Sequence, residues 1–427
     1  MSFLPPPLLQ RLKRLHRKVR ELRAGPREQA LCILPWIHLH ARTDGMALPC
    51  CVADEASPLG SLHTQSAVEL FNSETMRMLR LDMLAGVRNP ACRRCYALDD
   101  AGGSSLRQVF NREFADHVPE VENTAPDGSV DSDRIVYIDI RFSNLCNLRC
   151  RSCGSHSSTA WYQDDSATAP ADFRILRPGK NPEELWAQIE PLLPRAEKMH
   201  FAGGEPMMMD ETYHTLEKLL ALGRTDVALT YNTNATKWTH RHWDAVELWK
   251  RFSKVFIMAS VDGSGPRGEY IRKGMKWSRV LESCRRIRRE LPHAGLQINY
   301  TIGLMNALHL PDFCDEILAE GLVAADQIAL NPIQDPVYLS LTSLSPRLKA
   351  RVRALYEDRM AKLASSGPED VLRSRFREAL DFMDSRDTSS HLGEFRRRTR
   401  ELDRMRRESF PETFPELAEL LPAGAEA

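Results

Sequence analysis

The sequence predicts an α/β protein built on a parallel sheet, which is either an open doubly wound sheet or a complete or partial barrel. From residue 135 onward, short apolar or β-branched runs alternate with stretches of helical periodicity. The connections between these runs are long enough to hold a crossover helix, as parallel strands require. The length of 427 residues suits a large α/β barrel with one or two attached units. In both architectures, reactive groups are expected at the carboxyl ends of the strands.

The predicted elements follow one another in regular alternation. The expected strands cover residues 135–142, 198–203, 227–233, 255–261, 296–303 and 327–333. The expected helices cover residues 182–193, 212–223, 240–252, 277–291 and 311–321. We find no convincing internal repeat.

Other parts of the chain flank the barrel region, which is expected over 134–335. Within residues 1–30, leucine and valine recur at helical spacing, which predicts an amphipathic helix that docks on the body. A membrane-surface or partner-binding helix is the alternative. A cysteine-rich unit is expected over 31–115, followed by a linker or exposed loop over 115–133. Residues 336–427 predict a charged, helical C-terminal extension.

The charge balance excludes some classes of partner. Lys plus Arg and Asp plus Glu both total 58, so nothing general points to nucleic acid or an anionic membrane. The basic residues near the two ends lack the interleaved aromatics of a nucleic-acid surface. No apolar run approaches the roughly 18 residues that cross a bilayer, and the start of the chain is unlike a secretory signal. We therefore expect a cytoplasmic protein without a transmembrane segment.

The cysteines are unevenly distributed. Ten are present, at positions 32, 50, 51, 92, 95, 146, 150, 153, 284 and 314. In a large chain without a secretory signal, Cys-x-x-Cys pairs more often bind metal or do redox work than form disulfides. Cys284 and Cys314 lie on helical faces beside apolar residues, which predicts small core residues. The other eight predict metal or cluster binding.

Three cysteines lie in one loop directly after the first expected strand. The stretch NLCNLRCRSC places Cys146, Cys150 and Cys153 in a Cys-x3-Cys-x2-Cys pattern. A closed structural site uses four thiolates, whereas three leave one metal corner open for an outside molecule. The alternative is a zinc site with a fourth ligand elsewhere, such as His156.

This loop resembles the signature of the radical S-adenosylmethionine (SAM) enzymes, and the resemblance spans roughly residues 135–335. It implies a partial (β/α)6 TIM-like barrel and a 4Fe–4S cluster on Cys146, Cys150 and Cys153, whose open iron binds SAM. It further implies that one electron, from a reductant such as a flavodoxin or ferredoxin, cleaves SAM into methionine and a 5′-deoxyadenosyl radical. That radical abstracts hydrogen from a substrate, in a barrel that excludes water.

Further motifs recur in the family's order at successive strand ends. FAGGEPMM is similar to the family's Gly-Gly-Glu-Pro stretch, and glycines there let backbone approach the cofactor closely. YNTNAT resembles the third-strand motif, and ASVDG resembles the fourth, whose polar side chains would reach the ribose hydroxyls. The cofactor-binding residues implied by the resemblance are Gly203, Gly204, Glu205, Asn234, Ser260, Asp262 and Arg272.

Two of these assignments carry an alternative or a departure from the pattern. Arg272 would pair with the cofactor carboxylate because a guanidinium binds it bidentately; the alternative is a surface arginine. The residue before the last cysteine is often bulky in this family and packs on the adenine, but here it is Ser152. Adenine would then rest on backbone and on apolar residues of later strands, with Ile302 and Leu330 as candidates.

The N-terminal cysteines form a second group. Their spacing from Cys32 to Cys50 resembles the opening of the auxiliary-cluster modules called SPASM or, when shortened, twitch domains, although here the module precedes the barrel. The resemblance implies one auxiliary iron–sulfur cluster with Cys32, Cys50, Cys92 and Cys95 as ligands. Cys51 would be an alternate ligand or a bystander. A four-cysteine zinc site is the alternative, and His38 and His40 would be structural residues, ligands or proton carriers.

The leading functional hypothesis is therefore a radical SAM enzyme that abstracts hydrogen from a peptide or protein side chain. A dehydrogenase or epimerase of a sugar or another small-molecule alcohol is the alternative within the family. A zinc-stabilised, non-catalytic binding or scaffold protein is the alternative from a different class. No nucleic-acid partner is expected.

Overall fold

A computed structural model describes residues 25–165 and 174–422. It divides into two compact units, each assembled from several stretches of the chain. The first unit consists of the described residues up to Ser143, together with Leu176–Gly203 and Glu211–Leu229. The second consists of the described residues of Asn144–Ile175, together with Gly204–Asp210 and the chain from Thr230 onward. Most of the helix expected over residues 1–30 lies outside the described residues.

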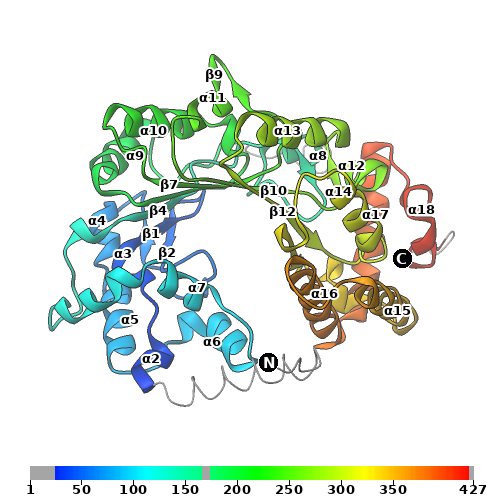
Figure 1. The fold of residues 1–427 in the computed structure, drawn as a ribbon, viewed down its shortest axis with the longest axis horizontal. Coiled ribbons are helices and arrows are strands. Elements are labelled where there is room, and N and C mark those ends of the chain that lie inside the picture. The colour runs from blue at the N-terminus through cyan, green and yellow to red at the C-terminus, as the bar shows by residue number, and fades with distance from the viewer. Residues whose placement is uncertain (1–24, 166–173, 423–427) are drawn as a thin grey trace. The chain divides into compact units, whose positions relative to one another are not determined.

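The first unit is built on strands in the order β6-β4-β1-β2-β3. Its strands are β1 His38–Ala41, β2 Met46–Leu48, β3 Gly60–Ser61, β4 Tyr137–Ile140 and β6 Lys198–Phe201. β1 runs parallel to β4, and β4 runs parallel to β6, whereas β2 and β3 add antiparallel strands beyond β1 (Figure 1). Its helices are α2 Pro26–Ala30, α3 Leu34–Ile37, α4 Ala67–Phe71, α5 Glu74–Leu84, α6 Arg93–Asp100, α7 Leu106–Glu113, α9 Pro182–Ile189 and α10 Asp210–Ala221.

Local signals in the sequence explain where several of these helices begin. Ser66 and Glu69 form a capping box at the start of α4, in which each side chain satisfies a backbone N–H of the other. Asn181 caps α9 ahead of Pro182, a residue suited to the first helical turn. The segment 115–133, which was expected to be a linker or exposed loop, is instead partly helical. A 3-10 helix spans Ala115–Asn123, because Val121 is buried and anchors it.

The second unit holds strands in the order β13-β12-β10-β7. Its strands are β5 Arg149–Cys150, β7 Ala228–Thr233, β8 Thr239–His240, β9 Trp243–Asp244, β10 Val255–Ser260, β11 Arg272–Lys273, β12 Gly295–Ile302 and β13 Ile328–Pro332. β10, β12 and β13 are parallel. Its helices are α8 Tyr162–Asp165, α11 Ala245–Trp249, α12 Gly265–Ile271, α13 Trp277–Glu290, α14 Leu310–Ala319, α15 Pro346–Lys362, α16 Pro368–Asp384, α17 Leu392–Arg406 and α18 Phe410–Thr413.

The prediction of an α/β fold with parallel strands and a helical C-terminus is confirmed. All six expected strands are present, as β4, β6, β7, β10, β12 and β13. The helix expected over 240–252 is wrong in its first half, where β8 and β9 form an antiparallel hairpin and only α11 is helical. Arg241 at the turn has a φ of 50°, and both it and His240 contact the Asp210 carboxylate. These contacts favour the turn over the helix.

The four C-terminal helices belong to the second unit. Tyr356 of α15 is fully buried, and its hydroxyl donates to the Ala307 carbonyl at 2.9 Å. Arg375 of α16 donates to the carbonyl of Ile328 at the start of β13. The extension is therefore packed on the strand-bearing part of its unit. Among the helices in the described ranges, none combines the length and apolar character that a membrane span requires.

Candidate functional site

The three-cysteine loop is held by a short strand pair in the second unit. Cys150 lies in β5, which pairs antiparallel with β11 so that Cys150 stands opposite Arg272. The indole N–H of Trp161 donates to the Cys150 carbonyl at 3.1 Å. The Cys150 side chain is buried, whereas Cys146 is half-buried and Cys153 is exposed. Short-range backbone contacts therefore fix the middle cysteine and leave its neighbours nearer the surface.

The thiols of this loop influence one another. Burial raises the pKa of Cys146 to about 12, and the neighbouring Cys150 adds to this effect. A hydrogen bond with Cys153 lowers the pKa of Cys150, with a further contribution from the Arg272 guanidinium, and the same hydrogen bond raises the pKa of Cys153. Buried thiols of this kind give up their protons when a metal supplies the compensating positive charge. The donor set therefore suits a cluster that takes three thiolates.

Within the described ranges, no group of three or more His, Cys, Asp or Glu side chains is close enough to hold a single metal ion. A 4Fe–4S cluster differs from a single ion because each cysteine binds a separate iron atom.

The Gly-Gly-Glu-Pro motif packs directly on the cysteine loop. The Glu205 N–H donates to the Leu145 carbonyl at 2.6 Å. A Cβ on Gly204 would lie 2.2 Å from the same carbonyl oxygen, so only glycine fits there without a shift. Gly203 belongs to the first unit and has a φ of 117°, a conformation that favours glycine. Gly204 thus sets the spacing between the second motif and the first cysteine.

The Glu205 side chain is buried and faces the third-strand motif. Its carboxylate accepts from the Thr233 hydroxyl at 2.7 Å and from the Asn234 backbone N–H at 2.7 Å. Burial raises its pKa, while these hydrogen bonds oppose the shift. The Asn234 amide donates to the Asn147 side chain at 2.9 Å and reaches the Cys146 sulfur at 3.9 Å. Glu205 and Asn234, both predicted from the sequence, therefore meet beside the first cysteine.

Asp262 and Arg272 form a buried ion pair in the second unit. Two guanidinium nitrogens of Arg272 contact the Asp262 carboxylate at 2.8 and 3.0 Å, and a third lies 3.8 Å from the Cys150 sulfur. Burial disfavours the arginine charge, but Asp262 and Cys150 outweigh it and raise the Arg272 pKa. Asp262 also accepts from the Thr301 N–H at 3.0 Å. Arg272 is therefore not a surface arginine, because it joins the fourth-strand motif to the second cysteine.

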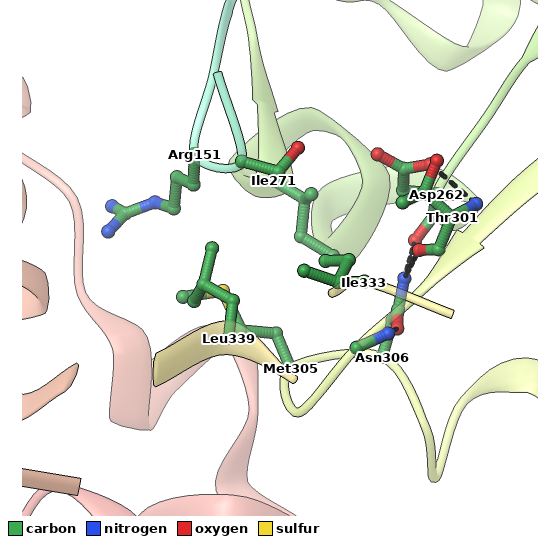
Figure 2. A pocket seen from close by; sticks show the side chains of 10 residues that line it. Arg151, Asp262, Ile271, Thr301, Met305, Asn306, Ile333 and Leu339 are labelled. Atoms are coloured by element: carbon green, nitrogen blue, oxygen red, sulfur yellow. Dashed lines mark hydrogen bonds between the residues drawn. The ribbon is translucent and has the colours of Figure 1, made fainter. Parts of the chain in front are cut away.

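A small pocket opens beside this ion pair (Figure 2). Its lining residues are Arg151, Ser152, Asp262, Ile271, Thr301, Gly303, Met305, Asn306, Ile333 and Leu339. Ser152 lines the pocket, whereas Ile302 and Leu330, the apolar candidates for the adenine, do not. Ile302 is fully buried because it alternates with Thr301 along β12 and points to the opposite face of the strand. The apolar lining comes instead from Ile271, Met305, Ile333 and Leu339.

Sequence reasoning missed several residues that support the site. Thr233, Asn147, Trp161, Thr301 and Asn306 each hydrogen-bond to a motif residue or its backbone. Thr233 and Asn147 lie within the quoted motifs YNTNAT and NLCNLRCRSC but were not singled out, and the other three lie outside the quoted motifs. Ser260, by contrast, was predicted and lies on the half-exposed face of β10.

The N-terminal cysteines lie in the first unit and influence one another's protonation. Burial raises the pKa of Cys32, and the thiols of Cys92 and Cys95 raise it further. Burial also raises the pKa of Cys50, where Cys51, Cys32 and Cys95 contribute. The pKa of Cys92 rises to about 12 by burial and by the charges of Cys50 and Cys95. These thiols influence one another although Cys32 and Cys95 are 63 sequence positions apart, and four thiolates are a donor set of the kind that binds an iron–sulfur cluster.

A row of polar side chains crosses the parallel strands of the first unit near Cys51. His40 of β1 stands opposite Asp139 of β4, and its Nδ1 lies 3.1 Å from the Asp139 carboxylate. Arg141 contacts the other carboxylate oxygen at 2.9 Å. Burial raises the pKa of Cys51 to about 11, with contributions from Asp139 and Arg141 in opposite directions. Because His40 contacts the buried Asp139 carboxylate, its role beside Asp139 is structural.

His38 is expected to make the first unit less stable in acid. It is 1% exposed, and burial lowers its pKa to about 3, with Asp139, His40 and His200 as its charged or titratable neighbours. An unfolded histidine has a pKa of about 6.5, so the unfolded chain binds more protons between these values. The stability that His38 contributes is thus present above pH 6.5 and is lost as the pH falls, by at most about 1.4 kcal/mol per pH unit.

This expectation is checked by urea unfolding of the metal-free protein at pH 7 and pH 5. His38→Gln should flatten the loss of stability between the two values, whereas the same change at the exposed His293 should not. Equal slopes for wild type and His38→Gln would contradict the assignment.

Two family models match parts of this chain. Residues 140–317 match the model of the radical SAM superfamily, and residues 32–96 match the SPASM iron–sulfur cluster-binding domain. The structure of native anSMEcpe with bound AdoMet and Kp18Cys peptide is similar at 18% identity with a TM-score of 0.36, over 51% of this chain and 58% of that chain. Streptococcus suis SuiB bound to precursor peptide SuiA is similar at 13% identity with a TM-score of 0.36, over 77% and 69%. The comparison with curated proteins gave no match.

Proposed function

The chain carries a radical SAM domain and, ahead of it, a SPASM iron–sulfur domain, and from this premise we propose that it is an enzyme that abstracts hydrogen from a peptide or protein side chain. Domains of these two kinds bind a 4Fe–4S cluster, SAM and an auxiliary iron–sulfur cluster. The domain ranges 31–115 and 134–335 remain predictions, as do the ligand assignments.

We assign the SAM-binding cluster to Cys146, Cys150 and Cys153. When reduced, such a cluster supplies the electron that cleaves SAM to methionine and the 5′-deoxyadenosyl radical. Asn234, whose side-chain amide lies 3.9 Å from the Cys146 sulfur, would orient the methionine end of SAM. Asp262 would bind the ribose hydroxyls in the pocket that it lines with Thr301. Arg272 would keep a positive charge beside the Cys150 sulfur, and its ion pair with Asp262 would hold the guanidinium in place.

One observation carries this proposal. The cysteine loop, Glu205 with Asn234, and Asp262 with Arg272 follow successive strands, and each pair makes a direct contact with a cysteine or its neighbour. Buried polar side chains are costly unless they are paired, so these two pairs beside Cys146 and Cys150 favour a cofactor site over a scaffold.

The half-exposed face of strands β7, β10 and β12 in the second unit supports a peptide substrate. The half-exposed strand residues are all uncharged, namely Thr230, Asn232, Phe256, Met258, Ser260, Gln297, Asn299 and Thr301. Asn299 donates to Asn232 at 3.2 Å and accepts from Gln297 at 2.7 Å. Amides and hydroxyls both donate and accept hydrogen bonds, as a peptide backbone does. A neutral peptide segment therefore suits this face, and SPASM domains accompany many enzymes that modify peptides.

We assign the auxiliary cluster to Cys32, Cys50, Cys92 and Cys95, with Cys51 outside the ligand set. Four protein ligands leave no open iron, which favours electron transfer or a structural role over direct substrate binding. The external electron donor would be a small redox protein such as a flavodoxin or ferredoxin.

Anaerobic reconstitution with iron and sulfide, reduction with dithionite and quantification of 5′-deoxyadenosine test the proposal. We expect a brown protein that converts SAM to 5′-deoxyadenosine and methionine only when the reductant is present. A colourless protein that retains zinc and leaves SAM intact would contradict the proposal and favour the scaffold alternative. Peptides and sugars are then added separately as candidate substrates. The class that serves as substrate is the one from which hydrogen is transferred to the 5′ carbon of the 5′-deoxyadenosyl radical.

A further inference from the structure

The C-terminal extension contacts the cysteine loop through buried charges. Arg151 lies between Cys150 and Cys153 and is 2% exposed. Its Nη2 contacts the Asp403 carboxylate of α17 at 2.6 Å and the Glu408 carboxylate at 2.9 Å. These residues are about 250 positions from the loop and lie beyond residues 140–317, which match the radical SAM model. In Figure 2, the Arg151 guanidinium points away from the other residues that line the pocket.

A second chain of charges runs from α17 to the other side of Cys150. Arg406 is buried, and its Nη2 contacts the Asp164 carboxylate at 2.7 Å. Asp164 in turn contacts Arg149, the residue before Cys150, at 2.7 Å. The Arg406 guanidinium also lies 4.7 Å from the centre of the Trp161 ring, and this indole holds the Cys150 carbonyl. Both residues that flank Cys150 are therefore tied to α17.

The two carboxylates of the extension are themselves held in place. Asp403 accepts from the Tyr270 hydroxyl at 2.5 Å and from the Phe410 N–H at 2.8 Å. Glu408 contacts Lys273 of β11, the strand that pairs with Cys150, at 2.9 Å. The Arg151 guanidinium lies 3.7 Å from the centre of the Tyr270 ring. The extension thus contacts Lys273 of β11 and Arg151, the residue directly after β5.

A gain in the stability of the fold does not explain why this network of buried charges is present. Burying the carboxylates of Asp164 and Asp403 and the guanidinium groups of Arg151 and Arg406 costs free energy that their attraction only partly returns. Apolar packing of the same volume is often at least as stable. What the network does provide is a fixed geometry, because several directional contacts hold each member. The geometry that it fixes is the backbone around Cys150.

We propose that the C-terminal extension is a clamp on the cluster-binding loop and that Asp403 and Glu408 are positioning residues for the SAM-binding cluster. They act through Arg151 and touch neither cluster nor SAM. The proposal rests on the function proposed above, since it assumes that Cys150 and Cys153 bind that cluster. Residues that support metal ligands from behind typically change metal affinity or activity about 10- to 100-fold when substituted.

The experiment compares wild type with Asp403→Asn/Glu408→Gln, which keeps side-chain shape and removes both charges. Glu401→Gln is the matched control, because Glu401 lies on the same helix and pairs with the exposed Arg397 at 3.7 Å. Three quantities are measured anaerobically: iron per chain, the change that SAM causes in the electron paramagnetic resonance spectrum of the reduced cluster, and the rate of 5′-deoxyadenosine formation. The thermal midpoint of each protein fixes a temperature at which all are folded.

We expect the double variant to lose the spectral response to SAM, and its rate to fall about 10-fold or more, while Glu401→Gln matches wild type. A folded double variant with wild-type spectrum and rate would overturn the clamp and leave the proposed function intact. Wild type that fails to cleave SAM would instead overturn the proposed function. If the double variant does not fold, Glu408→Gln decides by the same comparison, because it removes one ion pair and leaves the buried contacts of Asp403 in place.

Discussion

Replacing Cys146, Cys150 and Cys153 together with alanine is expected to abolish reductive cleavage of SAM. The three thiols are the only protein ligands that we assign to this cluster, so alanine leaves the iron without an anchor. In the proposed reaction, the electron that breaks the carbon–sulfur bond would come from this cluster, so no slower protein-based route would remain. The rate of 5′-deoxyadenosine formation should fall to that of a protein-free control with dithionite.

Iron content separates this effect from general damage. The triple variant should retain the iron of the auxiliary cluster, whose ligands are assigned to the first unit. Cys284→Ala is the matched control, because Cys284 is a buried cysteine of α13 with no assigned ligand role. It should cost stability by the loss of a small core side chain and leave the cleavage rate per folded protein unchanged. Cleavage by the triple variant would show that the radical chemistry has another origin.

The strands and motifs could be predicted because their signals are local. Buried and half-exposed residues alternate along β7, β10 and β12. This period of two can be recognised from the sequence of each strand alone. The buried positions of Cys284 and Cys314 also followed from helical periodicity. The cysteine spacing likewise needs only a few consecutive residues to be recognised.

Contacts that depend on tertiary structure could not be predicted in this way. The pairing of Arg151 with Asp403 spans 252 positions, and no local pattern distinguishes Asp403 from the other acids of a charged helix. The hairpin at β8 and β9 was missed because the contacts of Arg241 and His240 with Asp210 reach back some 30 positions. Ile302, one position from Thr301, was named with Leu330 as a candidate for the adenine, because the facing direction of a strand cannot be determined without its neighbours.

The substitution Gly204→Ala is expected to slow SAM cleavage by disturbing the cysteine loop. The added Cβ would lie 2.2 Å from the Leu145 carbonyl oxygen, 2.6 Å from its carbon and 2.7 Å from the Asn144 carbonyl carbon. All three atoms are backbone, so no side-chain rotation relieves the contact. The two segments must separate by roughly 1 Å to reach ordinary van der Waals distance. Leu145 precedes Cys146, and a misplacement of about 1 Å costs a reaction about 100-fold in rate.

An alanine substitution at a second glycine tests whether the steric clash alone slows SAM cleavage. Gly204 does not have a φ in the left-handed region, so alanine adds no backbone strain and the effect is purely steric. Gly393 of α17 also has no such φ and has no atom within 4 Å of an added Cβ. Gly393→Ala should therefore be neutral or stabilise the helix by up to about 1 kcal/mol, with an unchanged rate. The measurement is 5′-deoxyadenosine formation together with iron per chain for both variants. A Gly204→Ala protein that cleaves SAM at the wild-type rate would mean that the loop yields without displacing Cys146, and close packing of the two motifs would not be what positions the cluster.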